Sequence, residues 1–409
     1  MFEMTVIMAW AEFAVRWLHV ITAIAWIGSS FFFIALDLGL KKAPDMPKGV
    51  HGEEWQVHGG GFYHIQKYLV APDRLPEHLI WHKWQSYWTW LSGFALLVLV
   101  YYVGAEFYLI DANKLDLAVW QGVALSVASL ALGWVIYDQL CKSRFGEDNT
   151  RLMVFLFVLL VIMAWGYTQV FTGRAALLHL GAFTATIMSA NVFMIIIPNQ
   201  KIVVADLRAG RVPDAKYGKI AKQRSTHNNY LTLPVLFLML SNHYPLAFAS
   251  EYNWLIAGLV FLMGVTIRHF FNTMHATGGM LWWTWAATTA LFAGVIALSV
   301  TGQPQRQDLD LSQLSPVQAA FAADPGFEDV YWTVVGHCSM CHAAEPGWPG
   351  LHWAPKGVVL ETEAQVAKAA REIYLQAGIS HAMPPGSTVA MDAQSRDLIV
   401  DWFRRVNGS

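Results

Sequence analysis

The stretch that decides the fold is residues 151–171, RLMVFLFVLLVIMAWGYTQVF, whose only charged residue is Arg151 at its first position. A helix of about 20 apolar residues spans the roughly 30 Å of hydrocarbon in a bilayer. Seven more runs have this character, at residues 11–38, 84–103, 116–138, 175–198, 229–247, 252–270 and 279–300. Only 14% of all residues are charged, against about 25% in soluble domains. The sequence therefore predicts an all-α, polytopic membrane bundle of about eight transmembrane helices, in contact with the lipid bilayer.

Lysine and arginine are distributed unevenly among the loops. The loops after the first, third and fifth runs are basic, whereas those after the second and fourth offer only Lys114 and Arg174. Cytoplasmic loops are enriched in Lys and Arg, so the basic loops are expected in the cytoplasm and both termini outside. We therefore expect a bacterial inner-membrane protein. No block of like charge indicates nucleic-acid binding.

The composition changes after residue 300. We predict a membrane domain over residues 1–300, a polar linker over 301–315 (TGQPQRQDLDLSQLS) and a small helical domain over 316–409. Ser315-Pro316 is a favourable helix start, because proline suits the first helical position.

Two further signals mark helices in this last segment. Thr362 and Gln365 form a capping-box pattern that opens a helix through about residue 376. Asp392 can cap the last helix. The apolar stripe of that helix consists of Leu398, Ile399, Trp402 and Phe403.

Residues 337–342, HCSMCH, contain the attachment motif for a c-type haem. The thiols of Cys338 and Cys341, one helical turn apart, can add to the two vinyl groups, and His342 can be the proximal iron ligand. A zinc site would need two more ligands with suitable spacing, and no further cysteine follows. A thioredoxin-like site would need a βαβ context. We predict one covalent haem c, attached in bacteria outside the cytoplasm, where the loop charges also place the tail.

The sixth iron ligand is expected to be Met383, within residues 381–385, HAMPP. A methionine in a proline-stiffened loop about 40 residues after the histidine is typical of class I cytochromes c, in which a Met/His pair raises the potential of the iron. Met391 is another candidate for this ligand, but a packing role explains it better. His381 is an alternative ligand. In a haem with Met and His ligands, no coordination position of the iron is open. Such a haem transfers electrons.

Ionisable side chains within the apolar runs are costly and usually face a cavity or a partner. Three interpretations of the histidines remain open: interface or backbone contacts, ligation of a haem b between helices, and a substrate pocket. His19 is the favoured haem b ligand, because the helix containing Arg16, Trp26 and Gly28 resembles the opening helix of haem-binding membrane proteins of the HemJ type. An oxygen reductase is disfavoured, because no His-His pair occurs and the helices are too few.

Three sequence blocks carry a family resemblance. They are WQSYWTWLSG at 84–93, HNNYLTLPVLFLMLSNHYP at 227–245 and RHFFNTMH at 268–275. Together with the CxxCH tail, they resemble the bacterial membrane-bound urate oxidases (urate hydroxylases of the PuuD type). The resemblance implies oxidation of urate to 5-hydroxyisourate with oxygen from water. It also implies electron transfer through haem c to a soluble cytochrome c or a terminal oxidase.

A pocket for urate, a planar anion, needs arginine for charge, amides for the ring edges and aromatic faces for stacking. Candidate residues of these types are Arg268, Asn272, Asn228, Asn229, Asn191 and Gln169. The alternative function is a non-catalytic, membrane-anchored cytochrome subunit that accepts electrons from a quinol or a partner dehydrogenase. A haem-bearing assembly factor is a third. Eight helices rich in polar residues are more than an anchor needs, which favours the enzyme.

Overall fold

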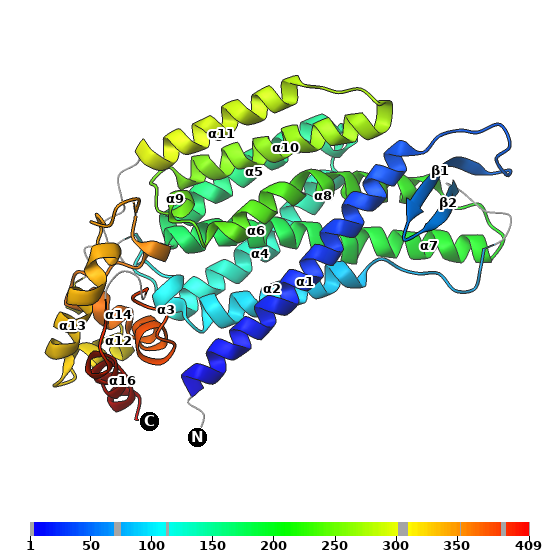
Figure 1. Ribbon diagram of the computed structural model, residues 1–409. Helices are drawn as coiled ribbons and strands as arrows, with labels where there is room; N and C mark the ends of the chain where they lie inside the picture. Colours follow the sequence, from blue (N-terminus) through cyan, green and yellow to red (C-terminus); the bar gives the residue numbers. More distant parts are fainter. Residues whose placement is uncertain are drawn as a thin grey trace.

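The computed structural model describes residues 4–68, 75–111, 114–301, 310–351, 353–385 and 390–408. Long helices from the first three ranges run side by side as a bundle. Shorter helices from residue 310 onward, here called the tail region, pack against one end of that bundle (Figure 1).

The bundle combines long helices with short connecting ones. They are α1 (Met4–Gly39), α2 (Trp84–Leu97), α3 (Ala105–Tyr108), α4 (Val119–Lys142), α5 (Asn149–Val170), α6 (Gly173–Ala190), α7 (Ile197–Arg208), α8 (Ala215–Ser241), α9 (Pro245–Phe248), α10 (Asn253–Thr277) and α11 (Trp283–Thr301). A π-helix, η1 (Val98–Tyr102), extends α2, and η3 (Asn191–Ile196) joins α6 to α7. A 3-10 turn, η2 (Arg144–Glu147), precedes α5.

Six helices in the described residues are long and apolar enough to cross a membrane, whereas the sequence predicted eight. The six are α1, α4, α5, the continuous helix Gly173–Arg208, α10 and α11. The other two predicted spans are helical but differ in character. α2 changes to π-helix after Leu97, and α8 begins with a charged half that lowers its mean hydropathy.

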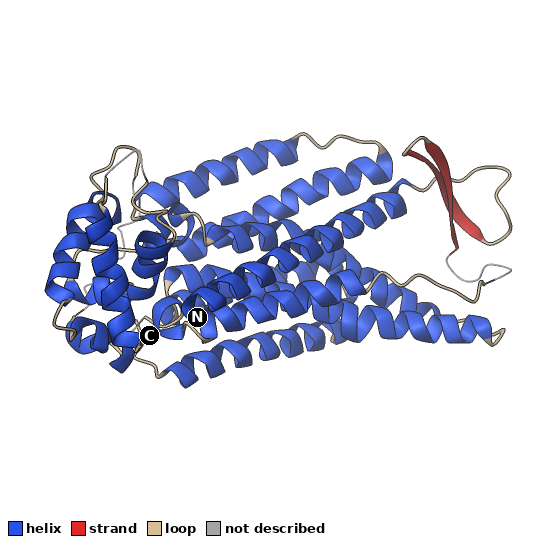
Figure 2. Cartoon of the chain, turned by 60° about the horizontal axis from the view of Figure 1, so that its bottom comes forward, coloured by secondary structure: helices blue, strands red, loops and turns tan. Residues whose placement is uncertain are grey.

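A β-hairpin in the loop after α1 was not predicted. Strands β1 (Val50–His58) and β2 (Gly61–Tyr68) pair antiparallel across a turn at Gly59 and Gly60. Both glycines have positive φ, of 59° and 81°, as two-residue hairpin turns require. The sequence analysis placed this segment in a loop, and the Gly-Gly pair was the local signal for a hairpin turn. The hairpin lies at the end of the bundle away from the tail region (Figure 2).

The basic loops gather at this hairpin end. Arg208 donates to the carbonyl of Glu77 over 2.8 Å, and Gln223 donates to that of Gly146 over 2.7 Å, which links the three loops predicted to be cytoplasmic. The first helix begins at the other end, on the side of the tail region (Figure 1). This arrangement agrees with both termini lying on one side of a membrane, opposite the basic loops.

The tail region is helical and has its own core. Its helices are α12 (Pro316–Ala322), α13 (Phe327–His342), α14 (Glu363–Lys368), α15 (Ala370–Ile373) and α16 (Ala393–Asn407), with short turns η4 (Leu311–Gln313), η5 (Pro355–Gly357) and η6 (Tyr374–Ile379). Ser315, Thr362 and Asp392 cap α12, α14 and α16 as predicted. The helix expected through residue 376 is interrupted at Ala369, which has non-helical ψ.

The apolar stripe of α16 faces the core of the tail region. Ile399, Trp402 and Phe403 are buried there, and Trp402 Nε1 donates to the carbonyl of Phe321 over 3.0 Å. A separate core fills the bundle. Residues 302–309 of the predicted linker lie outside the described residues, so the domain boundaries stay a prediction.

Candidate functional site

The CxxCH motif forms the last turn of α13. Cys338 and Cys341 are half-buried free thiols, and His342 is the final helical residue. His342 Nδ1 lies 2.7 Å from the carbonyl oxygen of Val358. A histidine that donates Nδ1–H to a carbonyl keeps Nε2 for a metal. Burial lowers the pKa of His342, which favours this neutral form. These residues fit a covalent haem with His342 as the proximal ligand.

The segment around Met383 is held by its backbone. Its N–H donates to the carbonyl of Gln376 over 3.0 Å, and Arg396 donates to its carbonyl over 2.9 Å. Met391 is buried in the tail core, consistent with a packing role. His381 is exposed. In the described residues, no group of three or more His, Cys, Asp or Glu is arranged to hold a metal ion.

Three of the candidate urate residues meet between α8 and α10. Asn229 Oδ1 accepts from Arg268 Nε over 3.3 Å and from Asn272 Nδ2 over 2.9 Å. Arg268 also donates to Asn272 Oδ1 over 3.0 Å, and its guanidinium lies 4.2 Å from the ring centroid of Phe31 on α1. Asn229 Nδ2 is buried without a partner. The structure thus brings Asn229 of α8 together with Arg268 and Asn272 of α10.

Asn228 and Asn191 belong to a second buried network. Asn191 Nδ2 donates to Asn228 Oδ1 over 2.9 Å. The Oδ1 of Asn191 accepts from Arg224 over 3.1 Å. Arg224 forms a buried ion pair with Asp138 at 2.7 Å. Sequence reasoning missed this pair because Arg224 was assigned to a basic loop; a lone aspartate within the apolar run of α4 was the available signal.

We expect the ion pair between Asp138 and Arg224 to be a major source of stability. Asp138→Asn leaves a buried guanidinium without its counter-charge, which costs about 3–5 kcal/mol. The double variant Asp138→Asn/Arg224→Gln is expected to lose less, because no unpaired charge remains. Thermal unfolding of the purified proteins in one detergent measures both.

Lys142→Gln is the matched control, because exposed Lys142 pairs with the same carboxylate at 2.6 Å. An Asp138→Asn variant that unfolds at the wild-type temperature would contradict the expectation.

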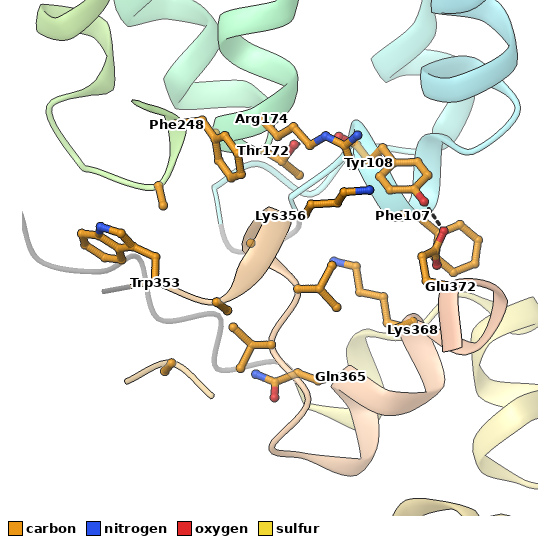
Figure 3. A pocket seen from close by; sticks show the side chains of 18 of the residues that line it. Phe107, Tyr108, Thr172, Arg174, Phe248, Trp353, Lys356, Gln365, Lys368 and Glu372 are labelled. Atoms are coloured by element: carbon orange, nitrogen blue, oxygen red, sulfur yellow. Dashed lines mark hydrogen bonds between the residues drawn. The ribbon is translucent and has the colours of Figure 1, made fainter. Parts of the chain in front are cut away.

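A cavity of about 510 Å³ lies between the tail region and the bundle. Figure 3 shows Arg174 and Tyr108 from the bundle facing Lys356, Lys368 and Glu372 from the tail region. Tyr108 donates a short hydrogen bond to Glu372. Burial raises the pKa of Glu372 and lowers that of Lys368. Sequence reasoning did not find this site, because its walls lie far apart along the chain.

The junction is also tied by hydrogen bonds beside the cavity. Ser315 Oγ donates to Glu106 Oε2 over 2.6 Å, so the cap of α12 contacts α3 directly. Gln318 donates to the carbonyl of Glu106 over 3.4 Å.

The family model described as "Urate oxidase N-terminal" matches residues 5–299. The chain belongs to this family. The matched segment includes the three sequence blocks that carry the resemblance and covers the helices that build both polar networks. No curated protein and no solved structure matches the chain.

Within the urate oxidase family segment, Gln169 lies apart from the other candidates. It is exposed near the end of α5, and its amide donates to Thr168 Oγ1 over 3.1 Å. The structure therefore does not bring Gln169 together with Arg268 or Asn228.

His19 is held at the contact between α1 and α2 of the same segment. Its Nδ1 lies 3.1 Å from the carbonyl oxygen of Thr89 and 3.1 Å from Ser92 Oγ. A Cβ on Gly93 would come within 2.8 Å of the His19 ring, so glycine permits this approach. The arrangement leaves Nε2 for another partner and fits a haem ligand. By contrast, both ring nitrogens of His179 are engaged, by Ala175 and Ser126.

Proposed function

We propose that this urate oxidase family member is a membrane oxidoreductase that oxidises urate to 5-hydroxyisourate and passes the electrons through a covalent haem c to the respiratory chain. The observation that carries the proposal is the presence, in one chain, of the family segment and a CxxCH motif whose histidine is oriented by Val358. The first supports the substrate, and the second supports an electron exit.

The reaction balances without molecular oxygen. Urate and water give 5-hydroxyisourate, two protons and two electrons, so a C–O bond forms from water and peroxide is not produced. Bound haem c supplies a one-electron acceptor, with a potential raised by a Met/His ligand pair. The protein must therefore hold urate, admit one water, accept protons and release two electrons singly to a soluble cytochrome c or a terminal oxidase.

Two features of the chain fit the stepwise release. His342 and Met383 are the residues that would hold haem c, and the backbone of each is fixed by hydrogen bonds. His19 is the residue that would hold a haem b, which would offer a second one-electron site within the bundle. We propose that the tail region faces the periplasm, because the basic loops gather at the opposite end of the bundle.

The direct test uses the purified, haem-loaded full chain in nanodiscs without oxygen. Urate is expected to raise the α-band of reduced haem c, and each urate should reduce two equivalents of added cytochrome c. Pyridine haemochrome spectra count c-type and b-type haem in the same sample. Reduction by a quinol but not by urate would overturn the enzymatic proposal and favour the electron-transfer subunit.

A further inference from the structure

The cavity at the junction of bundle and tail region combines aromatic walls with cations. Phe107, Tyr108, Phe248 and Trp353 line it, together with Arg174, Lys356 and Lys368 (Figure 3). Its volume of about 510 Å³ lies within the roughly 300–1,000 Å³ typical of sites for small organic ligands. Flat apolar faces and several cations suit a planar organic anion.

The cations of this cavity have few close partners within the described residues, although Asp111 acts on Lys368, and Glu12 and Glu372 act on Lys356. Neither Lys356 nor Lys368 makes a hydrogen bond or close ion pair there, and Arg174 Nε is buried without a partner. Arg174 lies 5.1 Å from the ring centroid of Tyr108. It also stands in the first turn of α6, where backbone N–H groups favour an anion.

Glu345, Glu361 and Glu372 also line the cavity, and each of them has an interaction partner. Glu361 accepts from the N–H of Ala344 over 3.1 Å, and Glu372 accepts from Tyr108. Burial raises the pKa of Glu372, which favours its neutral form.

The backbone of Lys356 indicates a constrained position. Lys356 has φ of 55°, one of two positive values among the described non-glycine residues. Side-chain-bearing residues avoid this left-handed region, and such strain concentrates at ligand sites. The turn brings Lys356 into the cavity beside Arg174 (Figure 3).

One residue connects the cavity to the haem site. Val358 lines the cavity, and its carbonyl oxygen is the partner of His342 Nδ1 at 2.7 Å. A molecule bound in the cavity therefore lies beside the peptide that orients the proximal iron ligand. Electron transfer falls steeply with distance, so this proximity favours oxidation of a molecule bound here.

The network of Arg268, Asn229 and Asn272 is less well placed. Asn253 begins α10 near the tail region, and Arg268 follows 15 residues later, about 22 Å along the helix at 1.5 Å per residue. We propose that urate binds in the junction cavity, where Arg174, Lys356 and Lys368 hold the anion beside the haem c ligand. This inference rests on the proposed function.

The test compares charge-removing variants of the full, haem-loaded chain. Lys368→Met and Arg174→Gln keep much of the side-chain length but remove the charge. Lys356→Asn also removes the charge, and asparagine tolerates the positive φ of this position. Two quantities are measured: the KM for urate in haem c reduction, and the Kd of urate for ascorbate-reduced protein by equilibrium dialysis. The reduced protein cannot turn urate over. Both constants are expected to rise tenfold or more for Lys368→Met and Arg174→Gln.

Matched controls separate binding from folding. Lys368→Arg should restore urate binding, and Lys216→Gln, at an exposed site on α8 far from the cavity, should leave it unchanged. All variants should keep wild-type haem content and ascorbate reduction. Unchanged KM and Kd in both charge variants, with an active wild type, would overturn the cavity assignment alone. A wild type that urate does not reduce would overturn the proposed function and the assignment with it.

Discussion

Replacement of Cys338 and Cys341 together by serine is expected to remove all covalently attached haem and to abolish urate-driven reduction of external cytochrome c. Serine cannot form the thioether bonds, and the only other cysteine of the chain, Cys141, lies on α4 within the bundle. The electrons from urate would then have no exit. Haem staining of the denatured protein and the rate of cytochrome c reduction measure the two effects.

Cys141→Ser is the matched control. Cys141 packs against the bundle core, so its replacement should leave the haem and the rate unchanged. The variant lacking both motif cysteines should still be found in the membrane, because the bundle and the tail region have separate cores. Continued urate oxidation with cytochrome c reduction in this variant would contradict the proposed path of electrons through haem c.

The features that the sequence predicted correctly are local ones. Ser315, Thr362 and Asp392 cap helices through contacts within three residues, so neighbouring positions contain the signal. The CxxCH motif is also local, and the haem c that it indicates stays a prediction. The apolar runs predicted helices correctly, because a backbone in lipid must satisfy its hydrogen bonds internally.

The features that the sequence did not reveal depend on packing between distant segments. Asp138 and Arg224 pair across 86 positions, and only the contact between α4 and α8 explains why two charges are buried there. The contact of Arg268 with Asn229 could have been predicted, because both residues lie in polar blocks that lipid would not select. The hairpin of residues 50–68 was missed because its strands are polar and sit inside a long loop.

The junction cavity illustrates the same limit. From the sequence, Arg174 is only a lone cation in a loop, and neither Lys356 nor Lys368 belongs to a recognisable motif. Their proximity depends on how the tail region contacts the bundle, through bonds such as that from Ser315 to Glu106. No periodicity or motif in the chain contains that information.

Met383→Ala is expected to lower the reduction potential of haem c on the order of 0.2 V, a fraction of the roughly 0.8 V range set by axial ligands. A thioether favours the reduced iron, so its loss favours the oxidised form. For one electron, a tenfold change in the equilibrium corresponds to about 59 mV. The variant should therefore be about a thousandfold harder to reduce, and urate-driven reduction should slow accordingly.

Redox titration of the purified full chain measures this shift, and three further variants assign its cause. Met391→Leu should keep the wild-type potential, because Met391 is buried in the tail core. His381→Ala should also keep it if His381 is not the ligand. Arg396→Ala removes the hydrogen bond to the Met383 carbonyl. This loosened loop should produce a smaller shift than loss of the sulfur itself. A wild-type potential in Met383→Ala would exclude Met383 as the ligand, and a changed potential in His381→Ala would assign that position to histidine.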